Sequence, residues 1–335
     1  MSELLVLSHA DVRRLLPMDE CIELMAKVLA DLARGRVWQP LRFVVRPPEE
    51  PTLMGLMPAH RSEPRPAYGL KAVCVFPENP ARGLDAHQGG VLLFDGETGQ
   101  FRALLDASAI TAVRTAAISA VATRALARED VKQLAILGAG VQARAHLEAL
   151  PHVRAFERVR IYSRTPEHAQ ALAAEAETPF RVEAVESVEA AVGDADVVVT
   201  ATSSREPVLE LGWLAPGAHV NAVGACSPTA RELDTTAVAR SRFFVDRRES
   251  ALAEAGDLLI PIQEGVIAET HVVGEIGGVL VGAVPGRRTP DEITLFKSLG
   301  IAIEDLAAGA RAYANALAAG GGTIIAMGGE RLAGA

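Results

Sequence analysis

The most informative change in the pattern of apolar and polar positions lies at residues 131–143, VKQLAILGAGVQA. A short apolar run, 134–137, stops at Gly138, and the apolar spacing becomes helical after Val141. This order predicts a strand, a tight turn and a helix. Further strand-like runs follow between helical stretches, at 158–162, 196–202, 219–225 and 242–246. Such alternation predicts an α/β fold with a doubly wound parallel sheet.

The chain before this region has a different pattern. A first helix is predicted from four apolar positions that share one face, namely Ile22, Met25, Leu29 and Leu32. After it, β-rich runs separated by Pro- and Gly-rich turns predict an antiparallel or mixed sheet, at 41–45, 52–57, 69–76 and 90–95. An Ala-rich stretch at 109–128 then predicts a long helix that can pack closely against another element.

A last helix is predicted near the C-terminal end. Thr289-Pro290 resembles a helix cap with proline in the first turn. Apolar side chains then recur with helical spacing, at Ile293, Phe296, Ile301 and Leu306. We therefore expect one helix to run through the Lys-Ser-Leu-Gly stretch at 297–300.

Composition and charge exclude several classes of function. The chain has 335 residues, which suits about two domains. Its 42 acidic and 33 basic residues form no long run of either sign, so we expect no nucleic-acid partner. The apolar runs are shorter than the roughly 20 residues of a membrane-spanning helix. We expect no membrane association and, because no secretory leader is recognisable, a cytoplasmic protein.

Cysteine and histidine positions argue against a metal site. The three cysteines, Cys21, Cys74 and Cys226, are isolated and form no C-x-x-C pair, which is typical of free thiols in a reducing compartment. The histidines show neither H-x-H nor H-E-x-x-H spacing. We therefore expect no bound metal.

The strand-turn-helix at 131–143 contains a dinucleotide-binding fingerprint. Gly138, Gly140 and Ala143 fit G-x-G-x-x-A. The first glycine permits the turn, the second lets a pyrophosphate approach the backbone, and the small third residue lets helix and strand pack closely. The alternative is a glycine turn in an α/β domain without a ligand, but the surrounding strands and helix favour a cofactor.

The end of the following strand bears on which cofactor binds. NAD-specific sites usually have Asp or Glu there, which accepts hydrogen bonds from the ribose. This chain instead has Ser163, Arg164 and Thr165. A cation flanked by two hydroxyl groups favours NADPH, with Arg164 pairing the 2′-phosphate. If Arg164 is only a surface turn residue, NADH remains possible.

Three cations before the fingerprint are candidates for binding a carboxylate. Arg42 interrupts LRFVV, Lys71 begins KAVCVF, and Arg114 lies within the Ala-rich helix. For one strand cation alone, a solvated face is the usual explanation. Together, Arg as a bidentate fork and Lys as a point charge and proton donor suit a small carboxylate substrate.

The chain resembles the ornithine cyclodeaminase/mu-crystallin family. The resemblance lies in ordered segments that cover nearly the whole chain: QPLRFVV, LMPAH, YGLKAV, ITAVRTAA, LGAGVQA, YSRT, HVNAVGA and LFKSLGIAIED. It implies a homodimer, with an α+β substrate-binding and dimerisation domain at 1–118 and 292–335. A Rossmann dinucleotide-binding domain at 119–291 lies between those two segments. Family membership alone does not choose among ornithine or lysine cyclodeamination, ketimine reduction and alanine dehydrogenation.

The resemblance also implies site residues. In the cyclodeaminases the positions matching Arg42, Lys71 and Arg114 hold the amino acid near the nicotinamide. Besides Gly138 and Gly140 of the fingerprint, cofactor-contacting positions fall at Val141, Gln142, Ser163, Arg164, Thr165, Thr200, Thr202, Val223 and Ser298.

One departure from the cyclodeaminases favours a reductase. They carry an Asp shortly after the strand that here reads NAVGA, where it is thought to bind the distal amine of the substrate. This chain has Cys226 at that place, and a thiol cannot act as that carboxylate. Mu-crystallin-like reductases also lack the Asp.

Our hypothesis is therefore an NAD(P)H-dependent imine reductase of proline metabolism. It would reduce Δ1-pyrroline-2-carboxylate to L-proline, or Δ1-piperideine-2-carboxylate to L-pipecolate, by hydride transfer to the imine carbon. Arg42, Arg114 and Lys71 would bind the carboxylate, with Lys71 the catalytic residue that maintains the proton on the imine. The alternatives are ornithine cyclodeaminase or alanine dehydrogenase and, more remotely, a non-catalytic ligand-binding protein.

Overall fold

The computed structural model describes residues 2–328, which form two compact units. The second unit is Thr115–Gly300, and the first consists of the chain before and after it. The division expected from the sequence lay at 118/119 and 291/292. The observed one lies inside helix α3 (Ala107–Leu126) and between strand β15 (Thr294–Lys297) and helix α11 (Ala302–Ala319).

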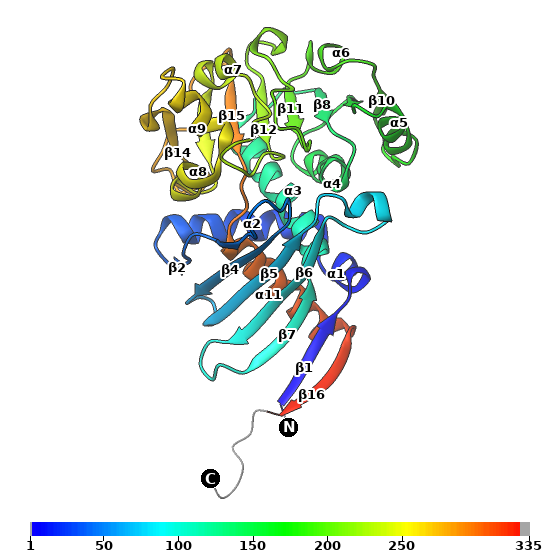
Figure 1. Cartoon of the computed structure of the whole chain (residues 1–335), viewed down its shortest axis with the longest axis vertical. Helices are drawn as coiled ribbons and strands as arrows, with labels where there is room; N and C mark the ends of the chain where they lie inside the picture. Colours follow the sequence, from blue (N-terminus) through cyan, green and yellow to red (C-terminus); the bar gives the residue numbers. More distant parts are fainter. Residues whose placement is uncertain (1, 329–335) are drawn as a thin grey trace, which may run out of the picture. The chain divides into compact units, whose positions relative to one another are not determined.

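The first unit is built on a mixed sheet, as the sequence predicts. Its strand order is β16-β1-β7-β6-β5-β4-β2, with β3 also paired to β4. All pairs are antiparallel except β1 with β7. Helix α11 packs against β4, β5 and β6 (Figure 1). The other elements are β1 (Ser2–Leu7), α1 (His9–Leu15), α2 (Met18–Ala33), β2 (Val37–Trp38), β3 (Phe43–Val45), β4 (Leu53–Arg61), β5 (Ala67–Val75), β6 (His87–Asp95), β7 (Phe101–Asp106) and β16 (Thr323–Gly328).

The alternation along β5 places Lys71 on the face that α11 covers. Gly69, Lys71 and Val73 share this face and are buried. Tyr68 lies on the opposite face of the strand and is exposed. A Cβ atom at Gly69 would lie 2.8 Å from Cδ1 of Leu306, so glycine allows α11 to approach the sheet closely. Lys71 is therefore a buried strand cation rather than one on a solvated face.

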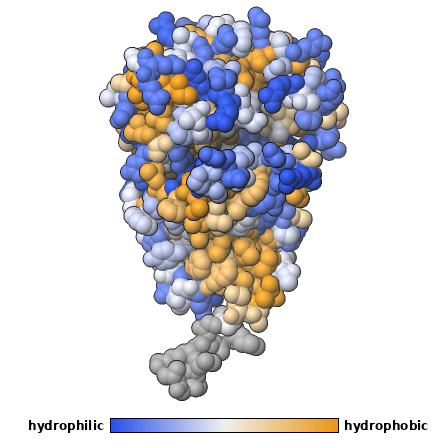
Figure 2. Space-filling model, in the orientation of Figure 1, coloured by the Kyte–Doolittle hydropathy of each residue, from blue (hydrophilic) through white to orange (hydrophobic). Residues whose placement is uncertain are grey.

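Apolar side chains are also exposed on the first unit. Figure 2 shows them, in orange, gathered over the region of its sheet. Large apolar residues exposed on strands of this sheet include Phe43, Val45, Met54, Tyr68 and Ile324. A patch of this kind is typical of a surface that another protein covers.

The second unit contains the parallel sheet predicted from the sequence. Its strand order is β10-β9-β8-β11-β12-β15-β13-β14, and every pair is parallel. Its remaining strands are β8 (Gln133–Leu137), β9 (Arg158–Tyr162), β10 (Arg181–Ala184), β11 (Val197–Thr200), β12 (His219–Ala222), β13 (Arg242–Val245) and β14 (Val272–Glu275). Its helices after α3 are α4 (Val141–Ala149), α5 (Pro166–Ala174), α6 (Val188–Val192), α7 (Thr235–Arg240), α8 (Arg248–Glu254), α9 (Gly256–Gln263) and α10 (Ile276–Leu280). The chain order reverses between β8 and β11, where ligands bind in such sheets.

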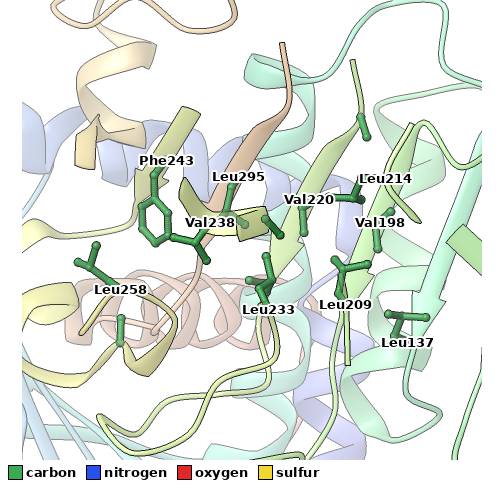
Figure 3. Close-up of a cluster of buried hydrophobic side chains, with 14 of the residues drawn as sticks. Leu137, Val198, Leu209, Leu214, Val220, Leu233, Val238, Phe243, Leu258 and Leu295 are labelled. Atoms are coloured by element: carbon green, nitrogen blue, oxygen red, sulfur yellow. The ribbon is translucent and has the colours of Figure 1, made fainter. Parts of the chain in front are cut away.

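An apolar cluster holds one face of this sheet to its helices and loops. Val198, Val220 and Leu295 lie on neighbouring parallel strands, and Val238 and Leu258 come from α7 and α9 (Figure 3). All of these side chains are fully buried. This packing fixes the strand ends from which the candidate site is built.

One sequence prediction about element type is wrong, and one strand was not predicted. The expected helix through 297–300 is instead strand β15, a turn and helix α11, which begins at Ala302. The Thr-Leu-Phe-Lys run of β15 is buried at all four positions in the middle of the parallel sheet, where side chains on both faces are covered. Gly300 then adopts a φ of +74°, which a helix interior does not allow. Strand β1 also precedes the first predicted helix.

Helix α3 matches the predicted long Ala-rich helix. Among the helices within residues 2–328, it alone is long and apolar enough to span a membrane. However, 83% of its most apolar window is buried inside the structure, as in a core helix. Arg114 on this helix is 4% exposed, so the guanidinium does not reach solvent by lying along the surface.

Candidate functional site

The glycine fingerprint forms a strand-turn-helix, as predicted. Gly138 follows β8 with a φ of +115°, and a Cβ atom there would lie 2.3 Å from the carbonyl oxygen of Ala201. Gly140 precedes α4, and a Cβ there would meet nothing within 4 Å. Among the described residues 2–328, no side-chain hydrogen bond caps this helix at Gly140. The first N–H groups of α4 thus adjoin an open position without a methyl group, which is the arrangement that a pyrophosphate needs.

The turn after β9 carries an exposed cation, Arg164. Within residues 2–328 it makes no ion pair. The backbone N–H of Thr165 donates to Ser163 Oγ at 3.2 Å, which shapes the turn. Ser163 to Thr165 therefore present hydroxyl groups and a guanidinium at the strand end next to the fingerprint.

The ends of β11 and β12 are joined by a carboxylate that the sequence analysis missed. Glu232 is fully buried and accepts hydrogen bonds from Thr200 Oγ1 at 2.8 Å, Thr202 N and Oγ1 at 2.7 Å, and Gly224 N at 2.7 Å. Burial raises the pKa of Glu232, and the charge of Lys297 opposes that rise. Glu232 thus holds together the two loops that carry the predicted cofactor positions Thr200, Thr202 and Val223.

A buried ion pair, Lys297 with Asp257, lies next to Glu232. Lys297 Nζ lies 2.9 Å from Asp257 Oδ2, and both residues are fully buried. Asp257 Oδ1 accepts the backbone N–H groups of Glu232 at 2.8 Å and Leu233 at 3.1 Å. Asp257 therefore fixes the backbone at Glu232, and Lys297 balances the buried charge of Asp257.

Ser298 and Cys226 lie next to this network. Ser298 is 2% exposed, and its buried Oγ has no hydrogen-bond partner among residues 2–328. Cys226 follows β12, with Sγ 3.6 Å from the oxygen of Val223 and 3.9 Å from that of Ser298. A buried hydroxyl without a partner is unusual in native structures and fits a position that a ligand contacts. Together with the open fingerprint, this residue set fits a dinucleotide.

The predicted carboxylate-binding cations come together in the first unit. Lys71 Nζ donates to Thr111 Oγ1 at 2.7 Å and to Asp305 Oδ1 at 3.4 Å. Arg114 donates through Nε to the same Asp305 oxygen at 3.0 Å and through Nη1 to Glu304 Oε2 at 2.8 Å. We call Lys71, Arg114, Glu304 and Asp305 the charge quartet. All four are at most 4% exposed.

The chain positions the acidic half of this quartet through α11. Glu304 and Asp305 lie in its first turn, where the helix dipole favours negative charge. Sequence analysis missed both, although an acidic pair inside the apolar run IAIEDLAAGA was a signal of buried partners. The quartet contains two cations and two anions, so it is neutral as a whole.

Burial and neighbouring charge tune Lys71. Its pKa is lowered to about 8, because burial disfavours the ammonium; Asp305 opposes this shift, and Arg114 and Arg42 add to it. Arg42, half-buried just before β3, is thus close enough to act on Lys71 electrostatically. A lysine with such a pKa can hold or release a proton near neutral pH. Among residues 2–328 no group of three His, Cys, Asp or Glu could hold a metal ion.

The chain matches known proteins over most of its length. The model of the ornithine cyclodeaminase/mu-crystallin family matches residues 2–320. A Δ1-pyrroline-2-carboxylate reductase from Bacillus cereus is 38% identical over 325 residues, which cover 96% of this chain and 99% of that protein. The ketimine reductase mu-crystallin of Mus musculus is 40% identical over 279 residues, 83% of this chain and 85% of that protein.

Solved structures show the same fold. That of the Thermococcus litoralis Δ1-pyrroline-2-carboxylate reductase in complex with NADH and L-proline has a TM-score of 0.93 and 40% identity, covering 95% of this chain and 99% of that one. An archaeal alanine dehydrogenase dimer with bound NAD has a TM-score of 0.91 and 32% identity, covering 97% and 99%. The chain belongs to the ornithine cyclodeaminase/mu-crystallin family.

Proposed function

We propose that the protein is an NAD(P)H-dependent imine reductase that converts Δ1-pyrroline-2-carboxylate to L-proline, Δ1-piperideine-2-carboxylate to L-pipecolate, or both. The observation that carries the proposal is the buried Lys71, whose ammonium lies beside Arg114 and Asp305. Relatives that span nearly the whole chain are reductases of this kind. Position 226 is a cysteine where the cyclodeaminases carry an Asp, and this argues against ornithine cyclodeamination.

The buried cations support a substrate that carries a carboxylate. Lys71 and Arg114 share the oxygen of Asp305, and the charge of Arg42 also acts on Lys71. Guanidinium groups pair with carboxylates in directed hydrogen bonds, and a lysine binds them as a point charge. We infer that these three cations hold the carboxylate of the imine.

Lys71 also has the role of keeping a proton on the imine nitrogen. An iminium ion accepts hydride better than a neutral imine, and the bound reduced nicotinamide supplies that hydride. Below a pH of about 8 the Lys71 ammonium is populated, so it can donate to the nitrogen directly or through water. Its hydrogen bond to Thr111 fixes the direction from which it does so.

We further propose that NADPH is the preferred cofactor and that NADH can substitute for it. The proposed holding residues are Gly138, Gly140, Val141, Gln142, Ser163, Arg164, Thr165, Thr200, Thr202, Val223 and Ser298. The exposed Arg164 supports NADPH because a guanidinium pairs with a 2′-phosphate in two parallel hydrogen bonds.

A homodimer in the cytoplasm is also part of the proposal. The exposed apolar residues of the first unit's sheet, such as Phe43 and Tyr68, supply a surface that a second copy can cover. The archaeal alanine dehydrogenase relative is a dimer. The three free cysteines suit a reducing compartment.

The test is a substrate panel with a matched pair of lysine variants. We expect rapid oxidation of NADPH with either cyclic imine, no ammonia release from ornithine, and no amination of pyruvate. K71A should lose on the order of 100-fold in kcat while its Kd for NADPH is unchanged. K132A, at an exposed surface lysine, is the control and should keep wild-type turnover. Undiminished turnover by K71A would remove Lys71 from the mechanism.

A further inference from the structure

Asp305 contacts both cations of the charge quartet. Its Oδ1 atom is 3.4 Å from Lys71 Nζ and accepts Arg114 Nε at 3.0 Å, so one oxygen serves both cations. Asp305 is 1% exposed and lies in the first turn of α11. Its neighbour Glu304 contacts Arg114 through Oε2, 2.8 Å from Nη1. The two acids are therefore not equivalent.

The surroundings of Lys71 otherwise oppose a positive charge. Burial is the main cause that lowers the pKa of Lys71, and the charges of Arg114 and Arg42 lower it further. Burial, and then the charge of Lys71, lower the pKa of His87 on β6. Asp305 is the group that acts in the opposite sense on Lys71, by its charge and by its hydrogen bond. Among residues 2–328, the charged and titratable groups that act on Lys71 or respond to it include Arg42, His87, Arg114 and Asp305, and Glu304 contacts Arg114.

We propose that Asp305 is a positioning residue that keeps the Lys71 ammonium charged and directed for imine reduction. This inference rests on the function proposed above. Without the carboxylate, Lys71 would face two guanidinium groups in a buried site, and would lose its proton at a lower pH. Asp305 thus sets the upper pH limit of turnover, whereas Glu304 contacts Arg114 and acts on substrate binding.

The experiment measures kcat against pH for the wild type, D305N and E304Q, with NADPH and the better cyclic imine. We expect the upper limb of the D305N profile to move to lower pH by at least about one unit, which is a tenfold change or about 1.4 kcal/mol. D305E should restore the wild-type limb. E304Q removes an acid from the same quartet, so it should raise KM without moving the limb.

A second readout needs no turnover. Trace labelling of amines with fluorodinitrobenzene at a series of pH values, read by peptide mass spectrometry, reports the titration of Lys71, with exposed Lys132 as internal reference. The labelling midpoint of Lys71 should fall in D305N and stay in E304Q. If D305N does not fold, D305S, which leaves room for water, should give the same fall.

The outcomes separate this inference from the proposed function. A wild type that reduces no imine would refute the function, while the labelling midpoints would still test Asp305. A folded D305N or D305S with an unmoved limb and an unmoved midpoint would overturn the inference. An equal shift in E304Q would also overturn it, because the effect would then belong to the whole quartet rather than to the Asp305 contact.

Discussion

An added methyl group would meet very different surroundings at the two glycines of the fingerprint. Alanine substitutions at these positions therefore test folding and cofactor binding separately. At Gly138 the backbone φ is +115°, and the new Cβ would lie 2.3 Å from the carbonyl oxygen of Ala201. At Gly140 the backbone is extended, with φ −87° and ψ −164°, and no atom of residues 2–328 lies within 4 Å of an added Cβ. G138A therefore strains the fold, whereas G140A occupies only the space that a pyrophosphate would use.

The expected magnitudes follow from these environments. A non-glycine residue in a sparsely allowed backbone region costs about 1–3 kcal/mol, and the clash with a backbone oxygen adds to that. We expect G138A to be destabilised by about 3 kcal/mol or more. G140A should change stability by less than about 1 kcal/mol. Its Kd for NADPH should rise at least about tenfold, or 1.4 kcal/mol, because the methyl group holds the phosphates away from the first N–H groups of α4.

Urea unfolding and a fluorescence titration with NADPH on both variants provide the assay. We expect an early unfolding midpoint for G138A, and a normal midpoint with weakened NADPH binding for G140A. A G140A protein that binds NADPH like the wild type would refute the placement of the pyrophosphate. A G138A protein as stable as the wild type would refute the strain argument.

Three further predictions concern the second unit. R164A should weaken NADPH at least about tenfold and leave NADH unchanged in equilibrium titrations, since only the phosphate pairing is lost; an equal loss for both would contradict the 2′-phosphate assignment. E232Q places an amide against the N–H groups of Thr202 and Gly224, so the affinities for NADPH and NADH should both fall by a similar factor. E206Q, at an exposed position, is the control. Unchanged affinities in E232Q would exclude the role of Glu232 in holding the two loops. Burial lowers the pKa of His146 from 6.5 to about 4, so the unfolded chain binds a proton that the folded chain does not as pH falls below 6.5. Urea unfolding should therefore show about 2 kcal/mol lost between pH 7 and 5 that H146Q does not lose, and identical pH dependence in both would contradict it.

Local signals in the sequence were enough to predict the cofactor half of the site. The apolar run before Gly138, the glycine spacing and the Ser163–Arg164–Thr165 turn each depend on residues close together in the chain. Strand β9 was predicted with its observed bounds, Arg158–Tyr162. Lys71 and Arg114 were found because a cation inside an apolar strand or helix is conspicuous.

Other features depended on distant partners, and local pattern could not reveal them. Arg114 meets Glu304 across 190 positions of sequence, and Asp305 across 191. Strand β15 was mistaken for helix because its apolar residues, with Ile301 and Leu306, also fit a helical stripe. Only the insertion of β15 between β12 and β13 in the sheet decides for a strand. The apolar spacing here fits both a helix and a strand, and the tertiary contacts of the sheet select the strand.

The most direct test of the account is the fate of a labelled hydride. NADPH carrying deuterium at the transferable C4 position is incubated with the protein and Δ1-pyrroline-2-carboxylate, and the proline formed is analysed by mass spectrometry and NMR. The account predicts L-proline with one deuterium on its α-carbon, in step with oxidation of the cofactor. Proline without deuterium, or no proline from a protein that binds both compounds, would contradict hydride transfer to the imine carbon.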